Sequence, residues 1–252
     1  MRLLGLTAAS VALLTIVGCG GNPAGSTHPT TPEEPGEPPI VAPPTTTPGT
    51  NPGTSPGTDL ASIARDVSTT YKGLGSLKAD YENRTNKGSQ TYYAKVAMTF
   101  AKPRKLRLDI KQSSDALLNG AIVVWLGGNT IKGRKDIGPI PIKQEHKLSE
   151  KANLRGWQYN QTDYDAMVTA FLANSAKAKV LGTSKVGSTT VTMVEFKSTL
   201  PGATIERVGI DTARNLPVYR EFRETASGQP VFTTTYTNLV PNAKVSSDAF
   251  AI

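Results

Sequence analysis

The sequence predicts an α+β fold that is mainly β. A strongly curved antiparallel sheet forms an incomplete, half-open barrel, and helices cover its concave face. Three observations predict this fold. Apolar and polar residues alternate at period two in many short segments after residue 75. Gly, Pro, Asn or Asp separates those segments. Two further segments carry an apolar stripe at helical spacing, and we expect these stripes to be buried against one face of the sheet.

Residues 1–18 are predicted to be an export signal. Arg2 is the only charged residue among the first 32, and an apolar run follows from Leu3 to Val17. A charged start, a short apolar core and a small-residue exit are the parts of a secretory signal peptide. The run of about 15 residues is shorter than the roughly 20 that a membrane-spanning helix needs. We therefore expect export and not a membrane span.

Cys19 is the only cysteine in the chain. It ends the tetrad Ile16-Val17-Gly18-Cys19, which resembles the lipobox of bacterial lipoproteins. The resemblance implies a diacylglycerol on the Cys19 sulfur, cleavage after Gly18 and acyl chains that anchor the protein, since two or more chains anchor stably. The alternative is an unmodified thiol within an ordinary signal. A single cysteine excludes an intramolecular disulfide.

Residues 19–58 are predicted to be a disordered linker. Eleven of the 18 prolines fall between Pro23 and Pro56, among Thr and Gly. Such a segment buries too little apolar surface to fold and acts as a semi-rigid spacer, or as an O-glycosylated stalk. Its one histidine, His28, is expected to be solvated.

Residues 59–252 are predicted to form one domain, because their length is enough for a sizeable core. Removing Arg2 from the 28 basic residues, and the three glutamates of residues 1–58 from the 20 acidic ones, leaves 27 and 17, a net charge of +10. On an exported protein this charge does not indicate nucleic-acid binding. It fits work near anionic headgroups, or a basic solvated surface.

Two helices are expected. Asp59 is a plausible N-cap for a first helix whose stripe runs from Leu60 to Leu74, and Gly73 and Gly75 end it. The second is expected over about 161–176, with Thr162 as its cap. Its stripe consists of Tyr164, Met167, Val168, Phe171 and Leu172.

About nine to eleven strands are expected. The alternation is clearest in residues 76–83, 90–102 and 105–111, which read as an antiparallel meander with one dry face. Residues 121–126 and 130–135 form the next predicted hairpin. Residues 137–147, with two prolines, are expected to be a loop or an edge segment. The remaining strands are predicted at 177–186, 188–198, 204–211, 216–224 and 230–239.

This order of elements resembles the LolA/LolB-like superfamily of bacterial lipoprotein carriers. The stretch "KPRKLRLDI", residues 102–110, is similar to a strand of that family. The C-terminal stretch matches the family's last hairpin through Asp211, Leu216, Pro217, Gly228, Tyr236, Asn238 and Leu239, and its ending through Asp248-Ala249-Phe250. These are turns and strand ends, so they are specific for the fold and say little about the ligand.

The resemblance implies an apolar cavity that holds an acyl chain. The predicted cavity residues come from the dry strand faces and the second helix: Leu77, Tyr81, Val96, Met98, Phe100, Leu108, Ile110, Trp125, Met167 and Phe171. The alternative is that the same residues form a filled core. The family's receptors carry an exposed apolar loop, and here residues 115–126 are either that loop or a core strand.

No motif predicts an enzyme, a cofactor or a metal site. His28 and His146 lack metal-ligand spacing, and His146 is expected at the surface. Asp163 and Asp165 fall on different faces of a helix and are expected near its N-terminus, where negative charge is favourable. Arg155-Gly156-Trp157 is either an Arg–aromatic contact at a cavity mouth or a loop anchor.

The sequence therefore predicts an envelope lipoprotein that binds and carries a lipid or lipoprotein acyl chain. It would be anchored at the outer membrane, or at the outer face of the cell membrane where there is only one. The alternative function is a sensor or interaction module that binds another envelope protein through the same fold. Neither function involves nucleic acid.

Overall fold

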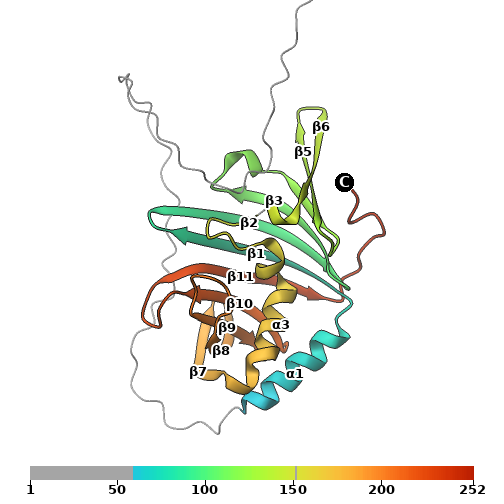
Figure 1. The fold of residues 1–252 in the computed structure, drawn as a ribbon. Coiled ribbons are helices and arrows are strands. Elements are labelled where there is room, and N and C mark those ends of the chain that lie inside the picture. Colours follow the sequence, from blue (N-terminus) through green and yellow to red (C-terminus); the bar gives the residue numbers. More distant parts are fainter. Residues whose placement is uncertain (1–58, 151) are drawn as a thin grey trace, which may run out of the picture.

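A computed structural model describes residues 59–150 and 152–252; the predicted signal peptide, Cys19, the linker and His28 lie outside them. The chain forms one open antiparallel sheet of 11 strands in the order β6-β5-β4-β3-β2-β1-β11-β10-β9-β8-β7 (Figure 1). The strands are β1 Ser76–Lys87, β2 Gln90–Ala101, β3 Lys105–Ser113, β4 Ile122–Trp125, β5 Thr130–Ile137, β6 Ile140–Lys147, β7 Lys179–Val186, β8 Thr189–Lys197, β9 Ile205–Asp211, β10 Leu216–Arg223 and β11 Pro230–Pro241. The predicted fold class is confirmed.

The first helix, α1 (Leu60–Gly73), forms as predicted. The Asp59 side chain accepts a hydrogen bond from the Ala61 backbone N–H, so one unpaired N–H of the first turn is satisfied. Ile63 and Val67 are buried on the inner face. The ammonium of Lys102 donates to the carbonyl of Tyr71 and lies 4.3 Å from the Tyr71 ring centre. A lysine at this place complements the negative end of the helix dipole.

The second helical segment differs from the prediction. Two helices meet at Asp163: α2 (Tyr159–Thr162) and α3 (Tyr164–Asn174), followed by a 3-10 turn at Ser175–Lys177. Asp163 has extended backbone angles and its carboxylate accepts from the Ala166 N–H, so Asp163, and not Thr162, is the cap. The expected start at Gln161 was wrong because a separate turn precedes the cap. Two other 3-10 turns lie at Ala116–Leu118 and Leu148–Glu150.

Strands β1 to β3 carry the predicted dry face. The burial of β1 and β2 alternates residue by residue, and the register places Tyr81 opposite Val96, and Met98 opposite Leu108. Gly88, at φ 57°, supplies the left-handed turn residue between β1 and β2. One face of this meander therefore enters the main core, as the period of two requires.

Most of residues 137–147 form an edge strand, one of the two forms expected for them, although Ile137 is the last residue of β5. β6 pairs with β5 and lies at one end of the strand order, and the β5–β6 hairpin projects from the sheet (Figure 1). Pro141 is tolerated here because an edge strand leaves one row of N–H groups unpaired. Leu117 and, near the hairpin turn, Ile137 and Ile140 are exposed.

The first and last strands close the two halves of the sheet onto each other. β1 pairs with β11 along most of its length, and β11 pairs on its other side with β10. β6 and β7 remain as free edges, so the sheet does not close into a barrel. Helix α3 lies within the curve of the sheet and contacts β8 and β10, while α1 contacts α3 and β10 (Figure 1).

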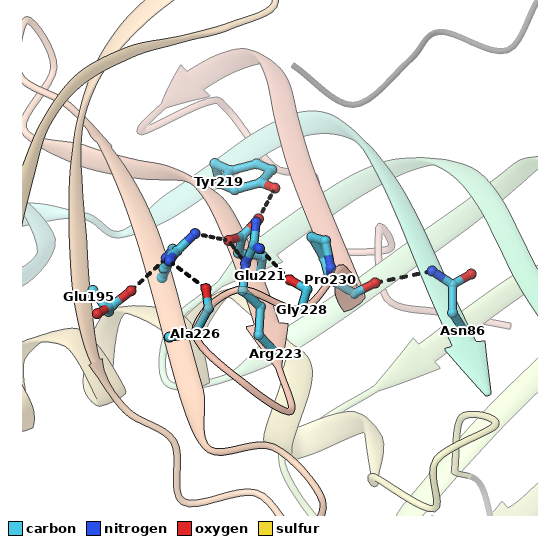
Figure 2. Close-up of polar contacts among 9 residues, drawn as sticks. Asn86, Glu195, Tyr219, Glu221, Arg223, Ala226, Gly228 and Pro230 are labelled. Carbon is cyan, nitrogen blue, oxygen red and sulfur yellow. Dashed lines mark hydrogen bonds and ion pairs between the residues drawn. The ribbon is translucent and has the colours of Figure 1, made fainter. Parts of the chain in front are cut away.

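The outer face of β8–β10 is held by a polar network. Arg207 donates to Glu195 at 2.8 Å and to Glu221 at 3.3 Å, and Arg223 donates to Glu221 at 2.6 Å. The Tyr219 hydroxyl donates to the same Glu221 carboxylate at 2.6 Å (Figure 2). Because Glu221 is buried and receives three donors, this network satisfies a carboxylate that burial alone would destabilise.

Candidate functional site

A cavity of about 90 Å³ lies on the inner face of the sheet. Strands β1, β2, β3, β4, β5 and β11 form its wall, and the segment of residues 152–164 covers it. Most of its 22 lining residues are apolar or aromatic. The aliphatic wall consists of Ala94, Val96, Met98, Leu106, Leu108, Ile110, Val123 and Ile131. Such a wall binds hydrocarbon, because it offers buried apolar contact and little for water to bond.

Aromatic side chains form the floor where the two halves of the sheet meet. Tyr81 and Tyr236 have ring centres 5.4 Å apart, and Tyr164 from α3 stands edge-on to Tyr236 at 5.2 Å. Tyr159 of α2 stands edge-on to Trp125 at 6.3 Å. Each of these contacts is an arrangement that aromatic rings favour. The helices are thereby seated over the cavity by ring packing.

The covering segment is anchored at Trp157. Its ring packs between Phe222 and Phe232, with centres at 5.0 and 6.0 Å, and its indole N–H donates to the Pro201 carbonyl at 2.9 Å. Arg155 lies 5.6 Å from the Trp157 ring and donates to the Asn86 carbonyl at 2.8 Å. Arg155 therefore makes an aromatic contact and also ties the loop down, while the place of that contact at a cavity mouth stays a prediction.

Arg104 fixes the other end of the cover. This residue of the β2–β3 turn donates to the Asn160 carbonyl at 2.7 Å and pairs with Asp163 at 3.2 Å and Asp165 at 3.1 Å. Its guanidinium also lies 5.0 Å from the Trp125 ring centre. One arginine therefore joins the strand turn to α2 and to the first turn of α3.

Asp163 is the only carboxylate in the cavity wall. Burial raises its pKa from 3.8 to about 6, against the opposing effects of Arg104 and the Ala166 N–H, and Asp165 adds to the rise. The Tyr71 hydroxyl donates to Asp165. Burial also raises the pKa values of Tyr81 and Tyr164, so both phenols are neutral at physiological pH.

Comparison with known proteins gives matches only among solved structures. No protein-family model matches the chain, and neither does any curated protein. An uncharacterized conserved protein of Thermus thermophilus has a TM-score of 0.47 and 9% identity, over 76% of this chain and 92% of that one. A LolA superfamily protein of Nitrosomonas europaea gives 0.35 and 10%, over 77% and 97%. Lipoprotein LppX of Mycobacterium tuberculosis gives 0.40 and 15%, over 75% and 98%.

One of these structures is described as a member of the LolA superfamily, the group that the sequence resembles. The TM-scores are below 0.5 and the identities do not exceed 15%. We transfer no ligand and no function from these structures.

The ten predicted cavity residues are all buried, and the structure divides them into two sets. Five line the cavity: Tyr81, Val96, Met98, Leu108 and Ile110. The other five pack in the main core away from the cavity wall: Leu77, Phe100, Trp125, Met167 and Phe171. Leu77 and Phe100 face each other near the α1 end of the sheet, and Met167 and Phe171 lie further along α3 than Tyr164, which reaches the cavity.

The structure also shows where His146 and residues 115–126 lie. His146 is half-buried on the edge strand β6, 3.2 Å from the Gln144 side chain, so it is less exposed than expected. Residues 115–126 consist mainly of a 3-10 turn and the core strand β4, in which Val123 and Trp125 are buried. Among the described residues, no group of three or more His, Cys, Asp or Glu side chains is arranged to hold a metal ion. No helix there is long and apolar enough to span a membrane.

Sequence reasoning missed the polar members of the cavity wall. Asn83, Thr85 and Thr234 lie on the inner faces of β1 and β11, and Asn153 belongs to the cover. The signal was present for β1, since its period of two continues from Tyr81 to Asn83 and Thr85. Asn153 had no such signal, because its position depends on the packing of Trp157.

Proposed function

We propose that this protein binds an acyl chain of a lipid or lipoprotein in the cavity between the sheet and residues 152–164, and carries or transfers it within the cell envelope. The apolar wall of that cavity is the observation that supports the proposal. Each methylene buried against such a wall contributes about 0.8 kcal/mol. About ten buried methylenes therefore supply about 8 kcal/mol, the free energy of binding at micromolar concentrations.

The size of the cavity limits what enters it. At about 90 Å³ it is smaller than the roughly 300 Å³ at the lower end of drug-sized sites. A longer chain therefore requires side chains to move aside. Met98 in the wall suits this role, because an unbranched thioether adapts its shape at low cost.

The proposed anchor and tether lie outside the described residues. We propose that residues 1–18 direct export, that Cys19 carries the lipid and that residues 19–58 hold the domain of residues 59–252 away from the bilayer. The anchor places the carrier at the outer membrane or at the outer face of the cell membrane. Labelling with radioactive palmitate tests this, and a Cys19→Ser variant that still incorporates label would contradict it.

Lipid mass spectrometry tests the cavity. The chain from residue 19 onward, with Cys19→Ser so that it carries no acyl chain of its own, is purified without detergent and extracted with organic solvent. We expect a stoichiometric lipid, and uptake of a fluorescent fatty acid by the emptied protein. An empty extract together with no uptake would overturn the proposal and favour the protein-binding alternative.

Two matched variants on β2 sharpen this test. Ala94 points into the cavity, and Ala97 belongs to the opposite face of the same strand. Ala94→Phe is expected to fill the cavity and to abolish uptake, whereas Ala97→Phe is expected to leave uptake unchanged. Overpacking costs about 1–3 kcal/mol, so circular dichroism and a melting curve confirm that both variants fold.

A further inference from the structure

The cavity has a polar end and an apolar middle, and Asp163 lies at its other end, where it pairs with Arg104 of the β2–β3 turn. The polar end is next to the β1–β2 turn, on the side of the sheet away from α1 (Figure 1). There Thr85 lies opposite Tyr92 and Phe232, and Asn83 lies opposite Ala94 and Thr234. Further along the strands the facing pairs are Val96 with Ile110 and Met98 with Leu108. An occupant would therefore meet unpaired polar groups next to the β1–β2 turn and hydrocarbon along the strands beyond them.

Several polar atoms of this cavity form no hydrogen bond with any described residue. They are Thr85 Oγ1, Asn83 Oδ1, Asn153 Nδ2 and the Tyr164 hydroxyl. Thr85 and Tyr164 are each 0% exposed. An unpaired buried polar group costs about 1–3 kcal/mol, and native proteins contain few of them. Four in one cavity indicate that a bound group completes them.

The orientation of Asn153 defines part of that group. Its side-chain oxygen accepts from the backbone N–H groups of Arg155 at 2.9 Å and Trp157 at 3.2 Å. The bonds to the oxygen fix which side of the amide carries the NH₂ group, and this NH₂ group is a donor that lacks an acceptor. Asn83 Oδ1 needs a donor, and the hydroxyls of Thr85 and Tyr164 serve as either. A carbonyl or ether oxygen together with a hydroxyl satisfies this set.

The charges of the wall exclude an anionic group. None of the 22 lining residues is Lys or Arg. The one carboxylate, Asp163, is already bound to Arg104. A carboxylate or phosphate entering this end would lose its water and meet no cation among the described lining residues, which is strongly unfavourable. The site therefore matches a neutral polar group.

We infer that the cavity selects a neutral amphiphile: an apolar chain joined to an ester and a hydroxyl, as in an acylglycerol, with the polar group held by Asn83, Thr85 and Asn153. This inference rests on the proposed function and narrows its ligand class. Free fatty acids and lipids whose phosphate would enter the cavity are the disfavoured classes.

Two probes of equal chain length test the selection: 1-decanoylglycerol and decanoate. Each displaces a fluorescent monoacylglycerol, a neutral reporter, from the chain beginning at residue 19 with Cys19→Ser, at about pH 8, where decanoate is ionised. We expect 1-decanoylglycerol to bind at least about tenfold more tightly. Thr85→Val keeps the shape of the side chain and removes its hydroxyl. We expect it to weaken the binding of 1-decanoylglycerol by about fivefold and to leave the binding of decanoate unchanged. Thr235→Val, on the other face of β11, is the control and is expected to change neither.

Asn153→Asp is the second variant. It keeps the oxygen that accepts from Arg155 and Trp157, so the loop retains its structure, but it replaces the donor with an oxygen. We expect this variant to weaken the binding of both probes. Decanoate should lose more affinity, because its carboxylate and the new carboxylate at position 153 would carry the same charge.

The outcomes separate the two proposals. Equal binding of the two probes, or a Thr85→Val variant that leaves their ratio unchanged, would mean that water satisfies these atoms; the neutral-ligand inference then fails while chain binding stands. If neither probe displaces the fluorescent monoacylglycerol, or if that neutral lipid does not bind, the proposed function fails as well.

Discussion

At the residue scale, Asp163 combines three roles: it caps α3, pairs with Arg104 and lines the cavity. Burial sets its pKa at about 6, above the ordinary 3.8. A carboxyl group whose pKa is raised on folding favours the folded state while it is protonated. Its contribution to stability is fully present below about pH 4 and is lost as the pH rises through about 6.

Asp163→Asn is therefore expected to remove a pH dependence. In the native protein this group lowers the free energy of unfolding by at most about 3 kcal/mol between pH 4 and 6, and the variant should lose that decline. The amide still offers an oxygen to the Ala166 N–H. Urea unfolding at a series of pH values measures the effect, with Asp136→Asn at the exposed hairpin as the control. A variant with the same pH profile as the native protein would contradict the assignment.

The buried pair of Glu206 and Arg220 is a second test at this scale. The two side chains meet at 2.7 Å and are 2% and 3% exposed, and Arg220 also donates to the Gln161 carbonyl at 3.1 Å. Removing one partner leaves a buried charge, so Glu206→Leu should lower the free energy of unfolding by about 3–5 kcal/mol. The double variant Glu206→Leu with Arg220→Met should lose less free energy of unfolding than Glu206→Leu alone. A double-mutant cycle by urea unfolding measures the coupling between the two side chains. Losses that simply add would contradict the expected coupling.

At the element scale, the β2–β3 turn holds the cover of the cavity through Arg104. Replacing it with Gln leaves Asp163 buried without its cation, and we expect a loss of about 3 kcal/mol. Amide hydrogen exchange should rise mainly in residues 159–167, because those backbone groups lose their anchor. Arg134→Gln, at an exposed pair with Asp136, is the control and should cost less than about 1 kcal/mol. Faster exchange spread evenly over the sheet would contradict the anchoring role.

The same elements show what the sequence allows one to predict. The period of two located β1, β2 and β3 and their buried faces, because a one-residue slip would expose every apolar side chain. The start of α3 was misplaced because Thr162 and Asp163 are both good caps. The choice between them depends on Arg104, which is 59 residues away in the chain. Which inner residues line the cavity also depends on a tertiary feature, the position of the Trp157 loop.

At the scale of the whole molecule, the pairing of β1 with β11 joins strands from the two ends of the described chain. Residues such as Tyr81 and Tyr236 meet across that pair, so the two halves of the sheet share one core. Such long-range pairing requires a large loop to close before its contacts form. We therefore expect the halves to unfold together and not as independent units.

The two tryptophans make that expectation measurable. Trp125 reports on the half with β1–β6, and Trp157 packs against Phe222 and Phe232 of β10 and β11. Trp125→Phe and Trp157→Phe each leave a single probe. Within each variant, the fluorescence and far-UV circular dichroism transitions in urea should coincide, as all-or-none unfolding requires. If fluorescence and circular dichroism report different midpoints within a variant, the halves unfold separately, and the cavity, whose wall draws on both, would open before the protein as a whole unfolds.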